Sequence, residues 1–405
     1  MPSSIRKALD ELPDTLDDTY ERILQNIPKQ KWQHAQRLFQ CMVAAIRPLR
    51  VKELAEIFAI GFGANVSPKL VEDWRPSDAE DAVLSACSSL ITIIIDSDDR
   101  DVKIVQFSHF SVKEYLTSDR LETSNVVNIR QFYIHLEPAH TTLARACLAV
   151  LLQLDRLDGR ADEDRLAVFP LALYAAEKWI DHAKFGNVAS QVQEGMEELF
   201  NPTKPHLRTW IRIHNVCNAI PPQTIDKFPS IELYYAAFCG FSGLAKHLII
   251  AHSLDVNAKV YDDKTPLHEA SYRGHADVAQ VLLDYEADIN AQDSAKWTPL
   301  HMASAGGHPK VMQLLLERGA ALDEQNEYMD TPLSLASYHG KLEAVRLLLA
   351  HGADMKIGDK TGITPFQYAT FKGYGDIAQL LLGSGAEVVQ VEDEETKTVS
   401  YIWDE

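Results

Sequence analysis

The sequence predicts a mainly α-helical protein. A winged-helix-like N-terminal domain with one β-hairpin leads through a helical bridge into a solenoid of repeated helical pairs. Three observations predict this fold. Apolar residues recur at spacings of three and four along much of the first 90 positions, as in helices with one buried face. A β-branched run at 90–95, a polar turn and a second apolar run at 102–107 indicate a hairpin. From residue 265 onward, one four-residue phrase returns every 33 positions, a period typical of stacked helical pairs.

The first 122 residues predict a helical segment and then the winged-helix-like domain. In segment 1–30 the apolar residues at helical spacing are Ile5, Leu9, Leu12, Leu16, Tyr20, Ile23 and Leu24. The domain at 31–122 opens with a helix expected from Trp32 to Ile46, which Arg47-Pro48-Leu49 interrupts. Its remaining expected elements are helices at 51–59 and 78–88 and strands at 90–95 and 102–107. Helices followed by a hairpin give the winged-helix outline.

Residues 123–229 predict a helical bridge, and residues 389–405 an acidic tail. Between 391 and 405 there are one basic and six acidic residues, including the run Glu392-Asp393-Glu394-Glu395. Such a run is expected to be a solvated end that could bind a basic partner weakly.

The repeated phrase reads Thr265-Pro266-Leu267-His268, Thr298-Pro299-Leu300-His301, Thr331-Pro332-Leu333-Ser334 and Thr364-Pro365-Phe366-Gln367. Thr caps a helix, and Pro suits the first helical position, where a missing N–H costs nothing. Nine residues after each Thr stands a Gly, which indicates a left-handed turn between two helices. These glycines are Gly274, Gly307, Gly340 and Gly373.

A fifth, degraded unit precedes these four, because Ile231-Glu232-Leu233-Tyr234 and Gly240 follow the same pattern with one extra residue near Ser253. Repeats are therefore expected over 230–388, with units at 231–264, 265–297, 298–330, 331–363 and 364–388. One unit cannot bury its apolar face alone, so neighbours supply the core. Such a stack offers a binding surface rather than chemistry.

The 33-residue phrase resembles the ankyrin repeat. A second resemblance is carried by LPDTLDDTYERIL at 12–24, RPLRVKELAEIFAI at 47–60 and FSHFSVKEYL at 107–116. These strings look like the winged-helix part of fungal NACHT proteins, which are NOD-like receptor relatives, and a related domain is found in GPI inositol-deacylase-like proteins. The resemblance implies a regulatory module followed by ankyrin repeats.

A NACHT nucleotide-binding domain needs a Walker A loop, GxxxxGK[ST], to hold the phosphates, and this sequence contains no such string. The nearest Gly-rich piece, Gly61-Phe62-Gly63-Ala64, lacks the following Lys. The chain thus resembles the regulatory and sensing part of such proteins without the nucleotide-binding NACHT domain. It is expected to be either a short paralogue or a gene model that begins late. A NACHT-containing protein acting in trans is one implied partner.

Composition bounds the partners and the compartment. The net charge is −19, and residues 231–390 hold 12 basic against 20 acidic side chains, which argues against nucleic acid or an anionic membrane. The cysteines are Cys41, Cys87, Cys147, Cys217 and Cys239, isolated among apolar residues as in reduced core thiols. The N-terminus does not read as a signal peptide, and no apolar run approaches membrane-spanning length. We expect a cytoplasmic or nuclear protein.

The sequence predicts no enzyme, cofactor or metal site, because neither HExxH, CxxC nor Gly-x-Ser-x-Gly occurs. His109 is the one weak candidate for nucleotide contact. In the resembled NACHT proteins the histidine of a matching FxHxSxxEFL phrase faces the β-phosphate of ADP. The alternative is a histidine that packs and hydrogen-bonds where the second hairpin strand meets the next helix.

A partner surface is expected on the repeats. Seven and eight places after the phrase starts stand Phe238, Tyr272, Arg273, Tyr338, His339, Phe371 and Lys372, which we call the groove row. In ankyrin-like stacks these positions line the concave groove, and aromatic and Arg residues are common interface anchors. The alternative is that the aromatics pack neighbouring helices. Three further aromatics, Tyr261, Trp297 and Tyr328, form a second candidate, the tip patch, at the hairpin tips.

The sequence therefore predicts a non-catalytic interaction protein that binds another protein as a scaffold or regulator. Two alternatives come from other classes. One is the regulatory half of a NOD-like system with a NACHT NTPase in trans. The other is a nuclear co-regulator that binds DNA through the winged helix, although Arg50 and Lys52 stand beside Glu53 and Glu56.

Overall fold

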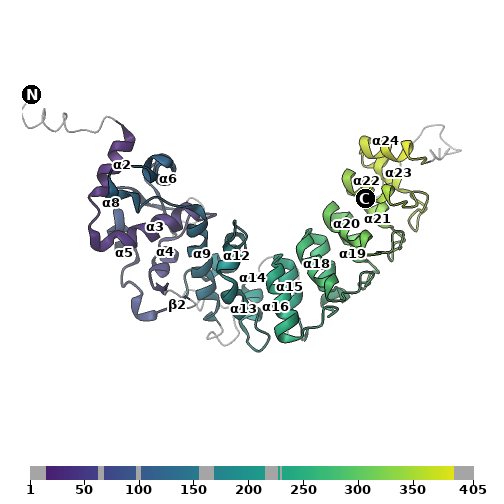
Figure 1. Cartoon of the computed structure of the whole chain (residues 1–405), viewed down its shortest axis with the longest axis horizontal. Coiled ribbons are helices and arrows are strands. Elements are labelled where there is room, and N and C mark those ends of the chain that lie inside the picture. The colour runs from purple at the N-terminus through teal and green to yellow at the C-terminus, as the bar shows by residue number, and fades with distance from the viewer. Residues whose placement is uncertain are drawn as a thin grey trace, which may run out of the picture. The chain divides into compact units, whose positions relative to one another are not determined.

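The fold was analysed in a computed structural model that describes residues 15–62, 68–96, 102–154, 168–214, 227–228 and 230–386. It is mainly helical, as predicted (Figure 1). The chain divides into two compact units, residues 1–222 and 223–405, which are taken in turn. The acidic tail and the part of the first helical segment before residue 15 lie outside the described residues.

The first described helix, α2 (Leu16–Gln25), begins at a capping threonine. The Thr15 side chain accepts a hydrogen bond from the Asp18 N–H at 3.1 Å. Tyr20 and Leu24 are buried, as the helical spacing predicts, but Leu16 is 58% exposed. Leu16 is the first residue of the helix, where spacing alone does not decide whether a side chain reaches the core.

The winged-helix outline is present in the first unit. Its elements are α3 (Trp32–Ala44), α4 (Val51–Phe58), α5 (Ala79–Cys87), β3 (Ile91–Ile95) and β4 (Lys103–Phe107). A short ladder, β1 (Ile60–Gly61) with β2 (Lys69–Leu70), was not predicted. The β3–β4 hairpin is antiparallel, with Ile93 opposite Val105. The Val105 N–H donates to Leu49 O at 2.9 Å, so the far edge of β4 is covered while β3 forms the open edge.

Short helices follow the hairpin and lead into the bridge. They are α6 (Phe110–Leu116), α7 (Asp119–Glu122) and α8 (Val127–Arg130). The bridge itself comprises α9 (Leu136–Leu151), α11 (Ala172–Ala183), α12 (Val188–Gln191), α13 (Gln193–Leu199) and α14 (His206–His214). Its core is aromatic, because Trp179, Phe200 and Trp210 are fully buried, and the two Trp rings meet edge to face with centroids 5.7 Å apart.

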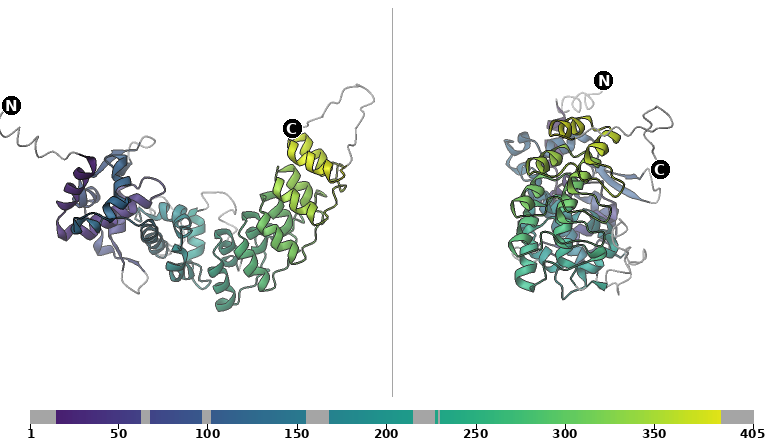
Figure 2. Two further views of the ribbon diagram at one scale, coloured as in Figure 1. Left: turned by 45° about the horizontal axis from the view of Figure 1, so that its top comes forward. Right: turned by 90° about the vertical axis from the view of Figure 1, so that its right-hand side faces the viewer.

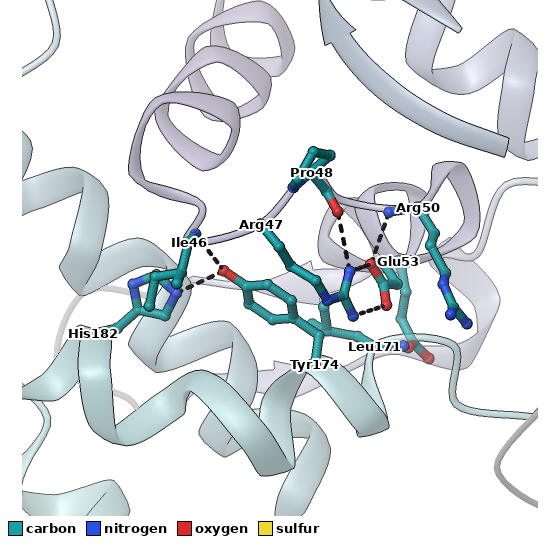
Figure 3. A network of polar contacts seen from close by, with 9 residues as sticks. Ile46, Arg47, Pro48, Arg50, Glu53, Leu171, Tyr174 and His182 are labelled. Atoms are coloured by element: carbon teal, nitrogen blue, oxygen red, sulfur yellow. Dashed lines mark hydrogen bonds and ion pairs between the residues drawn. The ribbon is translucent and has the colours of Figure 1, made fainter. Parts of the chain in front are cut away.

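A buried polar network joins the loop between α3 and α4 to the bridge helix α11 (Figure 3). Arg47 holds both carboxylate oxygens of Glu53 at 2.7 and 2.8 Å, and Glu53 also accepts from the Arg50 N–H. The Ile46 N–H donates to the Tyr174 hydroxyl at 3.3 Å, and that hydroxyl lies 2.8 Å from His182 Nε2. The winged-helix domain and the bridge are therefore tied together by hydrogen bonds as well as by apolar packing.

The second unit is a stack of five helical pairs (Figures 1 and 2). The first helices are α15 (Glu232–Cys239), α17 (Pro266–Arg273), α19 (Pro299–Gly306), α21 (Pro332–Tyr338) and α23 (Pro365–Phe371). The second helices are α16 (Ser242–His252), α18 (Ala276–Asp284), α20 (Pro309–Glu317), α22 (Leu342–Ala350) and α24 (Gly375–Gly383). First helices pack against first helices, and second against second, with closer packing in the first-helix layer.

Each pair has the local chemistry that its phrase predicts. Pro begins α17, α19, α21 and α23, and the preceding Thr adopts an extended conformation as the N-cap. The glycines between the helices have φ between 69° and 79°, the left-handed region that favours Gly. The extra residue of the first unit, Ser253, also adopts φ 50° and ends α16.

An Asp or Asn side chain, which the sequence patterns above did not predict, closes the hairpin tips between repeats. Asp293 Oδ1 accepts from the N–H groups of Ala295 and Trp297, at 2.9 and 2.8 Å. Asn326 and Asp359 occupy the same register and bond their own tips in the same way. One side-chain oxygen thus closes each of these turns.

Candidate protein-binding surface

Histidines of the repeated phrase tie the first helix of a repeat to the last residue of the same repeat, next to the start of the following one. His268 Nδ1 lies 3.2 Å from its donor, the Thr265 N–H, and the opposite nitrogen donates to Trp297 O, 29 residues later, at 2.9 Å. His301 repeats the arrangement with Thr298 and Asp330 O. Both side chains are fully buried, and burial lowers the pKa of His268 and lowers that of His301 to about 4. These histidines are neutral structural bridges.

The groove row lies at the C-terminal ends of the first helices. Tyr272 is 52% exposed and Tyr338 is 38% exposed, while Phe238 and Phe371 are half-buried. The basic members Arg273 and Lys372 are exposed, and so is His339. Burial and the positive charges of Lys341 and Lys372 lower the pKa of His339, so this side chain is neutral at physiological pH.

Part of the groove row packs repeat against repeat. The Arg273 guanidinium lies 3.7 Å from the centroid of the Phe238 ring, and the Lys372 ammonium lies 4.3 Å from that of Tyr338. In each pair the cation comes from the repeat after the aromatic residue. The Tyr338 ring also meets Tyr368 edge to face at 5.3 Å. For Phe238 and Tyr338, these contacts favour the packing alternative.

Tyr272 differs from these two aromatics. Among the described residues its ring forms no aromatic or cation–π pair, and it is the most exposed aromatic side chain of the groove row. Position eight of the next repeat is Gly306, which has no side chain to cover the ring. Within the groove row, Tyr272 has the exposure of an interface anchor.

The tip patch is less uniform than its sequence suggests. Tyr261 and Tyr328 are 40% and 47% exposed, but Trp297 is half-buried, with its ring centroid 6.2 Å from that of His301. Lys360 of the following tip lies 4.8 Å from the centroid of the Tyr328 ring. Whether the patch binds a partner stays a prediction.

His109 is the N-cap of α6. Its Nδ1 accepts from the Ser111 N–H at 3.3 Å and lies 2.6 Å from the Ser111 hydroxyl, while its ring packs on the exposed Phe110. It stands at the junction that the structural alternative describes.

Two carboxylates near the winged helix are not surface charges, contrary to the sequence analysis. Glu53 and Glu56 are 1% and 3% exposed, and they pair with Arg47 and Arg75. Glu56 also accepts from the Leu171 N–H at 2.7 Å. Because Glu53 and Glu56 are buried and paired, they do not offset the positive charges of the exposed Arg50 and Lys52.

A groove of about 400 Å³ lies beside the open edge of the hairpin. It is lined by α5 residues, including Glu80 and Leu84, by β3 and by Lys103, which forms an ion pair with Glu80 at 2.5 Å. Ile94 and Ile95 are 37% and 59% exposed. The groove therefore combines exposed isoleucines with a charged pair, and no sequence pattern predicted it.

The described parts of the chain contain no group of three or more His, Cys, Asp or Glu side chains that could hold a metal ion. None of their helices combines the length and apolarity needed to cross a bilayer.

Comparison with known families matches both halves of the chain. Residues 233–326 and 319–392 match the family model for ankyrin repeats, and residues 20–128 match that for the GPI inositol-deacylase winged helix domain. The NOD-like assignment stays a prediction.

One curated relative is "Azaphilone pigments biosynthesis cluster protein L" from Monascus ruber, 34% identical over 293 residues. The match covers 68% of this chain, and the chain spans 60% of the length of that relative. Together with the helical pairs and the hairpin described above, the family matches identify a GPI inositol-deacylase-type winged-helix domain followed by ankyrin repeats.

Proposed function

We propose that this chain is a non-catalytic scaffold or regulatory protein that binds another protein through the groove row of its ankyrin repeats. The observation that carries the proposal is the exposed Tyr272 ring, held on a rigid helix end between repeats that are otherwise closely packed. Aromatic anchors of this kind dominate many protein interfaces, because they bury a large apolar area at a small entropic cost.

Three buried titratable groups of the repeats support a binding role rather than catalysis. His268 and His301 have both ring nitrogens engaged in hydrogen bonds within their own repeats. Glu269 is held by Tyr234 and Arg273. A general base must keep a nitrogen or oxygen available for the substrate proton, and these side chains do not.

The test is capture of partners from a lysate by the full chain. Replacement of Tyr272, Tyr338 and Phe371 by Ala removes the aromatic side chains of the groove row that are not covered by Arg273. We expect capture of a specific partner to fall at least tenfold, as when interface anchors are truncated.

The matched control replaces Ile250, Tyr374 and Leu382 by Ala. These side chains are also exposed, at 59%, 37% and 41%, but belong to the second-helix layer. We expect the control to capture partners as the wild type does. Equal capture by the groove-row variant, with an unchanged circular dichroism spectrum, would rule out this surface.

A further inference from the structure

Aromatic residues on the repeats are covered by cations in a consistent direction. Phe238 is covered by Arg273, Tyr338 by Lys372 and Tyr328 by Lys360, with cation-to-centroid distances of 3.7, 4.3 and 4.8 Å. In all three pairs the cation belongs to the repeat that follows. A positive charge over the negative face of a ring is stabilising, and Arg and Lys both serve.

Among the described residues of the groove row, Tyr272 has a following repeat that places no cation over its ring, and the backbone explains why. A Cβ atom at Gly306 would lie 2.5 Å from His308 Cδ2 and 2.9 Å from the Tyr272 carbonyl oxygen. His308 Nε2 donates to the Tyr272 carbonyl oxygen at 2.8 Å, so the His308 ring lies directly against the backbone at Tyr272. A side chain at position 306 would disrupt this contact, so the third repeat cannot supply a cation to Tyr272.

We propose that the bound partner supplies this cation, as an arginine side chain laid over the Tyr272 ring; the inference rests on the proposed function and specifies its partner. Arg is favoured over Lys because its planar guanidinium stacks on aromatic faces and is more weakly hydrated. The charge of the repeats fits this partner, since residues 231–390 carry 20 acidic against 12 basic side chains. The neighbouring Arg273 is neutralised by its ion pair with Glu269.

The probe is a pair of peptides, acetyl-Gly-Ser-Arg-Ser-Gly-amide and the same peptide with citrulline in place of arginine. Citrulline keeps the shape and hydrogen-bonding length of arginine but has no charge. Each is titrated into the full chain, and the upfield shift of its side-chain Cδ protons by the ring current is followed by NMR. We expect the arginine peptide to bind about 3- to 30-fold more tightly than the citrulline peptide.

Protein variants locate the site. Tyr272→Phe keeps the ring face and is expected to retain both the binding and the upfield shift. Tyr272→Leu keeps an apolar side chain without a ring and is expected to lose the shift and the preference for arginine. Tyr374→Leu is the matched control, because its ring is also exposed but lies outside the groove row, and it is expected to behave as the wild type.

Equal binding of the two peptides overturns the inference, and so does an equal loss in Tyr272→Leu and Tyr374→Leu. The proposed function fails separately. If partner capture depends on the groove row while Tyr272→Leu leaves the preference for arginine unchanged, the surface binds protein without an inserted cation at Tyr272. If the peptide result is as expected but the groove-row variant captures partners normally, Tyr272 is a cation site that the physiological partner does not use.

Discussion

His301 makes the stability of the repeats depend on pH. An unfolded histidine takes up a proton near pH 6.5, whereas the pKa of folded His301 is lowered to about 4 by burial. Between these values the unfolded chain binds more protons than the folded chain, so acid favours unfolding. The contribution is fully present above about pH 6.5 and is lost as the pH falls toward 4, by at most about 3 kcal/mol.

The repeats themselves suggest the variant that tests this. Gln367 stands where His301 does, and its side-chain oxygen accepts from the Thr364 N–H at 2.8 Å. We expect His301→Gln to be less stable at pH 7.5 by about 1 kcal/mol, because the bond to Asp330 O is lost. We also expect a smaller loss between pH 7.5 and 5, measured by urea unfolding. An unchanged pH dependence would contradict the assignment.

Met329 is held in a backbone conformation that costs energy. Its φ is 63°, the left-handed region, at the tip position where Gly362 stands in the next repeat. Left-handed φ costs a residue with a Cβ about 1–2 kcal/mol, partly offset by the greater unfolded-state entropy of Gly. We expect Met329→Gly to raise the free energy of unfolding by up to about 1 kcal/mol. Met329→Ala, which keeps the Cβ, should give no such gain in the same urea titration.

For individual residues, the sequence predicted the features that follow from local sequence rules. The Thr caps and the left-handed glycines follow from the repeated phrase alone. The tip residues Asp293, Asn326 and Asp359 were missed, although an Asp or Asn at a fixed register is a visible turn signal. Exposure of individual groove-row aromatics could not be predicted, because it depends on which side chain of the next repeat lies over each ring.

The open edge of strand β3 favours aggregation. Leu90 O accepts from the Ser108 N–H, and the Asp96 N–H donates to Val102 O. Residues 91, 93 and 95 of β3 therefore direct their backbone N–H and C=O groups away from β4. An apolar edge of this kind can pair with another strand. We expect Ile95→Lys to reduce light scattering at a given fraction unfolded, although the new cation opposite Lys103 lowers the melting temperature slightly.

The control for this prediction is Val127→Lys. Val127 is 73% exposed but lies on the short helix α8, away from any strand edge. It removes a comparable exposed apolar side chain and adds the same charge. If both variants reduce scattering equally, net charge rather than the strand edge controls aggregation.

Elements were predicted well where the apolar period was long or the strand run was β-branched. Helices α3, α4 and α5 and the β3–β4 hairpin end within a few residues of their predicted bounds. The β1–β2 ladder was missed because two residues on each side are too few to give a period.

At the scale of the molecule, a single hydroxyl connects two parts of the first unit. Tyr174 accepts from Ile46, and its own proton is available to His182 Nε2, whose ring lies 2.8 Å from His140 through Nδ1. Burial, with a smaller effect of His140, lowers the pKa of His182 to about 3, so the ring is neutral. The order of the network in sequence, residues 46, 174, 182 and 140, could not be predicted without tertiary structure.

We expect Tyr174→Phe to lower the free energy of unfolding of the first unit by about 1–3 kcal/mol, because it leaves Nε2 of the buried His182 without this hydrogen bond. Hydrogen exchange measured by mass spectrometry should show faster exchange in residues 15–214 and unchanged exchange in residues 230–386. Tyr133→Phe, on a side chain outside the buried core, is the control. Equal acceleration in both units would mean that they unfold together.

The histidine bridges are not evenly distributed along the stack. His268 and His301 each donate to the carbonyl of the last residue of their own repeat, whereas Tyr234, Ser334 and Gln367 stand at this position in the first, fourth and fifth repeats. Mild acid therefore weakens the hydrogen bonds of the second and third repeats and leaves this position unaffected in the other three. On acidification the stack is expected to loosen first in its middle rather than at either end.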